Sequence, residues 1–184
     1  MRIKTIKVGS LQTNCFIIVD KKSSEAIVVD PGDEAGLIVP ELKDLKVKYI
    51  VLTHGHPDHF GALDEVQEAT RAPILAHSAD SWFVKPDNGL NEGDEIRIGD
   101  AILKVFHTPG HTEGGICLYT LGHLFSGDTL FKRYHGRVDL PGGSMNKMKK
   151  SLERLATLPD DTKVYPGHGE FTAIGQEKTG GSLA

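Results

Sequence analysis

Short apolar runs separated by glycine, proline and charged residues make up most of the chain, and most of these runs have the length of a strand. Their boundaries carry turn-forming residues, which suit short connections between strands. The nearly continuous apolar run at 47–52 is typical of a strand covered on both faces. The pattern predicts strands at Ile3–Val8, Asn14–Asp20, Ala26–Asp30, Val47–Leu52, Ile74–Ala76, Glu95–Ile98, Ile102–Phe106, Ile116–Tyr119, His123–Phe125 and Lys163–Tyr165.

Three segments, 33–45, 60–69 and 144–156, carry apolar residues at helical spacing instead. Gly36 and Pro40 interrupt the first of them. Strands mixed with helices predict an α/β fold in which helices cover the sheets. The apolar positions, expected to face the core, are Leu37, Ile38, Leu42 and Leu45 in the first segment, Phe60, Leu63, Val66 and Ala69 in the second, and Met145, Met148, Leu152 and Leu155 in the third.

Length and composition favour one globular domain, because 184 residues suffice for a single core and no linker divides the chain. We expect the domain to span residues 1–178 and residues 179–184 to form a mobile tail. The composition, 39% hydrophobic and 25% charged, excludes a disordered chain. The net charge of −4 has the wrong sign for general binding to nucleic acid, so we expect no nucleic-acid partner, although a local basic patch stays open.

The sequence indicates where the protein is located, but it does not indicate the oligomeric state. The first residues lack the apolar core of a signal peptide, and no uncharged stretch is long enough to span a membrane, so we expect no membrane partner. Cys15 and Cys117 lie in apolar runs outside any C-x-x-C pair, which indicates small buried side chains in a reducing, cytoplasmic environment. The oligomeric state stays open.

The segment Thr53-His54-Gly55-His56-Pro57-Asp58-His59 places three imidazoles and a carboxylate directly after a predicted buried strand. His54 and His56 are two residues apart, and Pro57 favours an extended backbone at His56, so both rings can point to one side. Asp58 and His59 follow as the chain turns, and can point toward a second ion. The alternative for Asp58 is a helix cap.

Further residues of metal-ligand type follow other predicted strands: His111, Asp128 and His168. Loops beyond strand ends are where sites gather in layered α/β folds, so all seven donors can share one location. Taken alone, each of these three residues could equally be a solvated loop residue or, for Asp128, a turn former. His77, His123 and His135 carry no pattern beyond that of ordinary loop or surface histidines.

The order T-H-G-H-P-D-H, H-T-P-G-H-T, S-G-D-T-L-F and P-G-H-G resembles the metallo-β-lactamase superfamily, and most closely its short glyoxalase II-like hydrolases. The similarity extends over nearly the whole chain, including L-Q-T-N-C at 11–15 and V-D-P-G at 29–32. It implies an αββα sandwich in a single domain, with two metal sites at the edge of the sheets.

The resemblance also implies roles for individual residues. One ion is expected on His54, His56 and His111. The other is expected on Asp58, His59 and His168, with Asp128 as a bridge. His107 and Asp30 are expected to support the ligands from behind. Zn is the first candidate for the two divalent ions, with Fe or Mn as alternatives, because the donors are imidazoles and carboxylates without thiolate.

The resemblance implies a small-molecule substrate as the partner, and the implied chemistry is hydrolysis of a thioester such as an S-acylglutathione. Two ions about 3.5–4 Å apart would lower the pKa of a shared water to near 7, and the resulting hydroxide would attack the carbonyl. Asp58 is the expected catalytic residue, orienting the attacking water. Arg137, after Gly136, matches a basic residue that holds glutathione, but the aromatic residue expected two positions later is Asp139.

Other functions of the same fold remain open at this point. The main alternative is a mononuclear iron persulfide dioxygenase, and retention of Asp58, His59 and His168 favours two ions over one. Lactonase or β-lactamase activity and a non-catalytic metal-binding module are further alternatives. A nuclease is disfavoured because the chain has no RNA-binding insertion.

Overall fold

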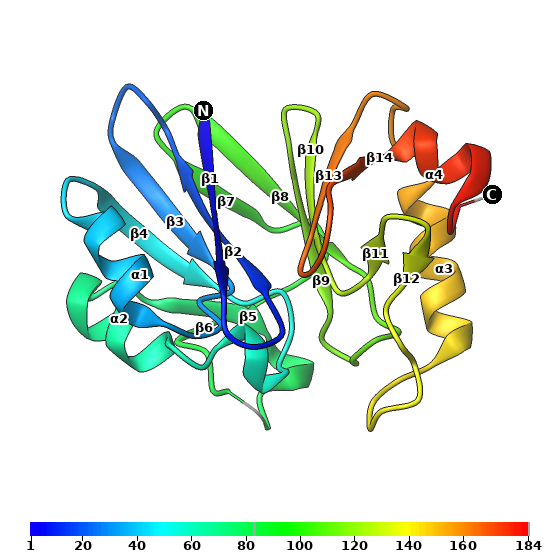
Figure 1. Ribbon diagram of the computed structural model, residues 1–184, viewed down its shortest axis with the longest axis horizontal. Helices are drawn as coiled ribbons and strands as arrows, with labels where there is room; N and C mark the ends of the chain where they lie inside the picture. The colour runs from blue at the N-terminus through cyan, green and yellow to red at the C-terminus, as the bar shows by residue number, and fades with distance from the viewer. Residues whose placement is uncertain (83, 184) are drawn as a thin grey trace.

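The computed structural model describes residues 1–82 and 84–183, in which two β-sheets pack face to face and helices cover their outer faces (Figure 1). Helices α1 (Ala35–Ile38) and α2 (Leu63–Thr70) lie on one side. Helices α3 (Met145–Leu155) and α4 (Ile174–Gly180) lie on the other. The predicted αββα sandwich is confirmed.

The first sheet has the strand order β1-β2-β3-β4-β5-β6. Strands β1 to β3 pair antiparallel, whereas β3 to β6 pair parallel. The carboxyl ends of the parallel strands therefore share one edge, and the histidine-rich segment begins there, directly after β4. The strands are β1 (Arg2–Val8), β2 (Thr13–Val19), β3 (Glu25–Val29), β4 (Lys46–Val51), β5 (Ile74–His77) and β6 (Asn88–Leu90).

The second sheet has the order β14-β13-β10-β9-β8-β7, and β10 pairs with β13 in parallel. A two-stranded hairpin, β11 and β12, follows β10. The strands are β7 (Glu95–Ile98), β8 (Ala101–His107), β9 (Ile116–Thr120), β10 (His123–Gly127), β11 (Leu130–Phe131), β12 (Tyr134–His135), β13 (Lys163–Pro166) and β14 (Thr172–Ala173). Short 3₁₀ turns are η1 (Val39–Leu42), η2 (Pro57–His59) and η3 (Ser78–Asp80).

Buried apolar side chains form three clusters, one between the sheets and one beneath each helical layer. Strand β2 shows how one sequence serves two of them. Cys15 and Ile17 face the helix side, whereas Phe16 and Ile18 face the second sheet. A strand buried on both faces needs an unbroken apolar run, which is why the sequence predicted these strands well.

Several predictions need correction, and Leu37 and Ala69, which we expected to face the core, are exposed. The segment 33–45 is not one helix, because α1 passes into η1 with Pro40 in the first turn of the 3₁₀ helix, and proline lacks the N–H that would continue an α-helical ladder. Strand β4 is covered on both faces only at Ile50 and Val51, since Lys46 and Lys48 are exposed.

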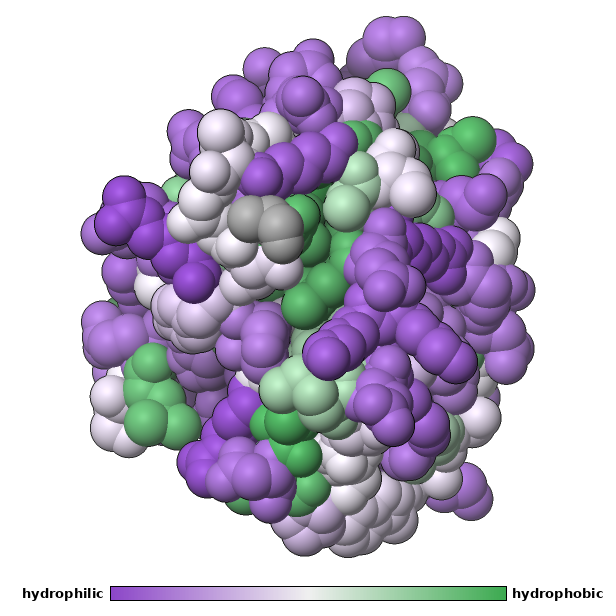
Figure 2. All heavy atoms as spheres, turned by 90° about the vertical axis from the view of Figure 1, so that its right-hand side faces the viewer, coloured by the Kyte–Doolittle hydropathy of each residue, from purple (hydrophilic) through white to green (hydrophobic). Residues whose placement is uncertain are grey.

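Helix α3 agrees with its predicted range, and Ser144 caps it by accepting a hydrogen bond from the Lys147 N–H. Met148, Leu152 and Leu155 are buried as predicted, but Met145 is exposed. Hydrophilic residues cover much of the outer face on the side of α3 and α4 (Figure 2). Within the described residues, no helix has the length and apolar character needed to cross a membrane.

The chain end makes more contacts than its polar sequence indicated. Helix α4 was not predicted, and it contains the first two residues of the expected tail. Leu183 packs against the cluster under α3 and α4, and Ala184 lies outside the described residues. Mobility of the tail stays a prediction.

Candidate metal centre

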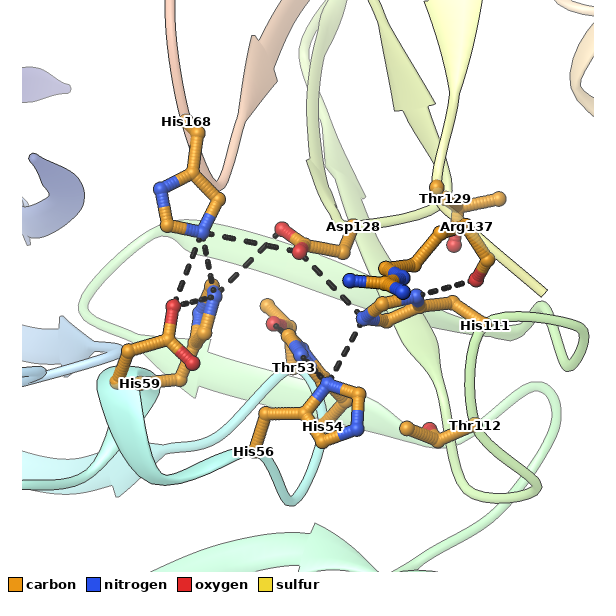
Figure 3. Close-up of polar contacts among 12 residues, drawn as sticks. Thr53, His54, His56, His59, His111, Thr112, Asp128, Thr129, Arg137 and His168 are labelled. Carbon is orange, nitrogen blue, oxygen red and sulfur yellow. Dashed lines mark hydrogen bonds and ion pairs between the residues drawn. The ribbon is translucent and has the colours of Figure 1, made fainter. Parts of the chain in front are cut away.

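The structure brings the seven predicted donors to one edge of the sandwich, where loops from both sheets meet (Figure 3). The first sheet contributes the segment after β4, and the second contributes the loops after β8, β10 and β13. Pro57 opens η2, and His56 before it is extended, as the sequence predicted. Segments far apart in the chain therefore converge because their strands end at the same edge.

The first group consists of His54, His56 and His111. His54 Nε2 lies 3.1 Å from His56 Nδ1, which lies 2.8 Å from His111 Nε2. Ligand nitrogens about 2.0–2.1 Å from one tetrahedral ion stand roughly 3.3 Å from each other. The three nitrogens are therefore spaced as ligands of a single ion.

The second group consists of Asp58, His59 and His168. His168 Nε2 lies 3.1 Å from Asp58 Oδ2 and 3.2 Å from His59 Nε2, and His59 Nε2 lies 3.5 Å from Asp58 Oδ2. These separations again match ligands that share one ion. A second set of donors thus stands beside the first.

Asp128 lies between the two groups (Figure 3). Its Oδ1 is 3.5 Å from His59 Nε2, and its Oδ2 is 3.5 Å from His111 Nε2. Asp128 Oδ1 is also buried without a hydrogen-bond partner among the described residues. A buried carboxylate oxygen without a donor is costly, and a cation at this position would satisfy it. The donor set therefore fits a dinuclear metal centre.

Four of the histidines hold one ring nitrogen away from the centre through a hydrogen bond. His111 Nδ1 donates to the carbonyl oxygen of Arg137 at 2.7 Å, and His168 Nδ1 donates to that of Leu11 at 3.0 Å. A carbonyl oxygen only accepts, so Nδ1 of each ring carries a proton, and Nε2 is the nitrogen that points toward the centre. Such partners fix the ring orientation that a metal ligand needs.

Asp30 orients the remaining two rings, as predicted. Its Oδ2 accepts from His59 Nδ1 at 2.9 Å and from the hydroxyl of Thr53 at 2.7 Å. The Thr53 oxygen in turn lies 3.2 Å from His54 Nδ1, where it accepts. One buried carboxylate therefore fixes a histidine of each group.

The two groups differ in electrostatics. Burial lowers the pKa of His54 well below its ordinary value, and the surrounding imidazoles lower it further, so this ring stays neutral. Burial also opposes charge on His59, but the carboxylates of Asp128 and Asp30 raise its pKa to about 9. Burial would raise the pKa of Asp58, yet its hydrogen bond with a neighbouring imidazole brings it to about 2. The second group therefore contains paired charges, whereas His54 of the first group is neutral.

Both cysteines are free and buried, and neither belongs to the donor set. Burial raises the pKa of the Cys117 thiol to about 11 and raises that of Cys15 further. A protonated thiol is a poor ligand, so the centre offers only nitrogen and oxygen donors. That set suits Zn, Fe or Mn.

Arg137 lies beside the centre through its backbone, which accepts the His111 hydrogen bond. Its exposed guanidinium pairs with Asp139 through two hydrogen bonds of 2.8 Å. The His107 Nε2 donates to the carbonyl oxygen of Glu113, in the loop that follows His111, and its ring stacks on His77 at 4.0 Å. His107 thus supports the loop backbone through these contacts.

Asp80 and Thr53 were not singled out from the sequence. Thr53 could have been, since it stands next to the first ligand. Asp80 lies in an S-A-D-S stretch without any motif, yet it is buried and accepts hydrogen bonds from two loops of the centre. His123 and His135 match their expected ordinary roles, bound to the Tyr165 hydroxyl and the Gly136 carbonyl oxygen.

With this fold and this cluster of histidines and aspartates, the molecule has the architecture of a metal-dependent hydrolase. The chain belongs to the metallo-β-lactamase superfamily, whose family model matches residues 8–168.

Several relatives match this chain over most of its length. An uncharacterized protein of Aquifex aeolicus is 44% identical and covers 97% of this chain and 94% of its own length. Hydroxyacylglutathione hydrolase GloC of Haemophilus influenzae is 32% identical, covering 97% and 95% respectively. A Bacillus velezensis protein named "probable polyketide biosynthesis zinc-dependent hydrolase BaeB" is 36% identical, covering 89% and 76%.

Solved structures show the same fold. The BLEG-1 B3 metallo-β-lactamase superposes with a TM-score of 0.92 at 34% identity, covering 100% of both chains. TTHA1623 in a di-iron-bound form superposes with a TM-score of 0.86 at 32% identity, covering 98% of this chain and all of its own. These similar proteins thus include one whose name describes it as zinc-dependent and one whose structure was solved with two iron ions.

Proposed function

We propose that this protein is a two-metal hydrolase of thioesters, of the hydroxyacylglutathione type. The observation that carries the metal part is the convergence of seven donors on one spot, with the buried Asp128 Oδ1 lacking a hydrogen-bond donor among the described residues. The similarity to GloC supports the thioester part. We also propose a cytoplasmic location, in line with two free thiols.

The donors divide into two ligand sets and a bridge. His54, His56 and His111 would hold one ion, and Asp58, His59 and His168 the other. Asp128 would join them. Zn is the proposed metal, with Fe or Mn as alternatives that the same donors accept. When bound, the ions supply a water of lowered pKa and polarise the carbonyl of the substrate.

The side chains of the protein perform the remaining tasks. Asp58 is half-buried at the centre and ionised, because its pKa is about 2, so it can accept a hydrogen bond from the attacking water and orient it. The guanidinium of Arg137 would receive an acidic group of the substrate. To do so, the guanidinium must give up its ion pair with Asp139. Because that ion pair is exposed to solvent, breaking it costs little free energy.

The test is a substrate panel assayed on protein of measured metal content. Thioester, lactone, β-lactam and glutathione persulfide substrates are compared, with oxygen uptake recorded for the last. We expect two ions per chain and the highest kcat/KM for the thioester, without oxygen uptake. One tightly held iron with rapid oxygen uptake on the persulfide would instead identify a dioxygenase. Fastest turnover of the β-lactam or the lactone would contradict the proposed substrate.

A further inference from the structure

Asp80 is a buried carboxylate outside the donor set, at the end of η3, and it is only 4% exposed. Its Oδ2 accepts from the Gly55 N–H at 2.9 Å and from the Thr112 hydroxyl at 2.7 Å. Its Oδ1 accepts from the Gly114 N–H at 2.7 Å. All of these donors belong to two short segments that carry metal-ligand candidates.

The hydrogen-bond donors to Asp80 lie close to metal-ligand candidates in the sequence. Gly55 stands between His54 and His56, and Thr112 directly follows His111. The first segment leaves the first sheet after β4, and the second leaves the other sheet after β8. Asp80 therefore ties together, beside the ligands themselves, the two loops whose separation sets the spacing of the first ligand group. The packing is close, since a Cβ at Gly114 would lie 2.6 Å from Asp80 Cγ.

The first group needs such a tie. His56 Nδ1 lies 3.1 Å from His54 Nε2 and 2.8 Å from His111 Nε2. His54 and His56 come from a loop of the first sheet and His111 from a loop of the second, so the spacing of these nitrogens depends on where the two loop backbones lie. The second group includes the Asp58 carboxylate, whose Oδ2 lies 3.1 Å from His168 Nε2. The second group thus contains a direct contact between a carboxylate and an imidazole, whereas the spacing of the first group depends on the backbone of its two loops.

We propose that Asp80 is a positioning residue for the first metal site, which it preorganises by clamping the loops of His54, His56 and His111. This inference rests on the metal centre of the proposed function and not on the identity of the substrate. Because the loops that Asp80 joins carry the ligands of the first site, its effect falls chiefly on one of the two ions.

The experiment measures Zn²⁺ binding to the metal-depleted protein by competition with a chromophoric chelator. Asp80→Asn keeps the shape but replaces one acceptor oxygen by a donor, which then faces an N–H or hydroxyl donor. Loss of partners behind metal ligands weakens metal binding by roughly 10–100-fold. We expect this loss in only one of the two binding steps. The His168→Ala variant lacks a ligand of the second site, so the binding step that it retains belongs to the first site. That step is the one that Asp80→Asn should weaken.

Asp20→Asn is the matched control. Asp20 is also buried and accepts two hydrogen bonds, both from Ser23. It follows the end of β2, at the edge of the sheet opposite to the centre. Both binding steps should keep wild-type affinity in this variant.

Three results would overturn the inference: unchanged affinities in Asp80→Asn, equal weakening of both steps, or weakening of the second step alone. If far-UV circular dichroism shows that Asp80→Asn does not fold, Thr112→Val decides, since it removes one of the three donors and leaves the carboxylate. It should weaken the same step severalfold, and wild-type binding would refute the clamp. A wild-type protein that binds fewer than two ions would contradict the proposed function instead.

Discussion

Gly167 allows a very close approach of backbone to the metal centre, and its replacement by alanine gives a sharp test of the geometry. A Cβ at this position would lie 2.3 Å from Asp128 Oδ1 and 2.7 Å from His59 Cε1. Ordinary contacts of a Cβ begin at 3.4 Å, so a neighbour must move by about 1 Å. Gly167 does not have a positive φ, so an alanine at this position is disfavoured by the steric clash and not by backbone strain.

The surroundings cannot absorb this movement easily. Gly167 N–H donates to the Gly127 carbonyl oxygen at 2.9 Å, and the Gly167 carbonyl accepts from the Asn14 N–H at 2.7 Å. His59 is held by Asp30. Overpacking of this kind costs about 1–3 kcal/mol of unfolding free energy. A misplacement of ~1 Å can reduce catalysis ~10²-fold.

We therefore expect Gly167→Ala to fold with lower stability, to lose metal from both sites because the bridging carboxylate shifts, and to lose about 10²-fold in kcat/KM. Urea unfolding, metal analysis after dialysis and thioester hydrolysis measure the three effects. Gly36→Ala is the control, since Gly36 lies in α1, where an added Cβ would meet nothing within 4 Å, and helix propensity predicts a gain of about 0.5–1 kcal/mol. Full metal content and wild-type turnover in Gly167→Ala would refute the proposed bridge.

Three further outcomes follow from the same structure. Asp128→Ala should lower the occupancy of both metal sites, whereas His168→Ala should chiefly empty the second, and equal, full metal content in both variants would contradict the bridging role. Removal of metal with a chelator should abolish hydrolysis and lower Tm, and Zn²⁺ should restore both; turnover by the metal-free protein would exclude the mechanism. Cys15 and Cys117 should resist a thiol reagent at pH 8 in the folded protein and react in denaturant, because burial raises the pKa of both thiols. Fast labelling of the folded protein would contradict their burial.

The sequence predicted those parts of the fold in which burial imposes a pattern. Strand β2 was found because both of its faces are covered, and α3 because its polar and apolar sides alternate at helical spacing. The missed elements β6, β11, β12 and β14 have only two or three residues each, too few for a period to appear. Helix α4 carries two glycines and few apolar residues, and its position depends on tertiary contacts such as Ile174 in the core.

The ligand candidates could be predicted for a different reason. His54, His56 and His59 are close together in sequence, so their chemistry is visible without any fold. Asp80 could not be found in this way, because its partners include backbone groups of segments 25 and 34 residues away, and an N–H group leaves no trace in the sequence. Motifs thus reveal the donors, but not the groups that hold the donors in place.

The two halves of the centre are held by different physical means. In the second half, Asp58 and Asp30 lie within 3.5 Å of imidazole nitrogens, so opposite charges attract even without an ion. In the first half, burial lowers the pKa of His54, so this ring stays neutral and carries no charge for a carboxylate to attract. Geometry there must come from the loops, which is why a carboxylate that binds only backbone and a hydroxyl can matter as much as one that touches a ligand.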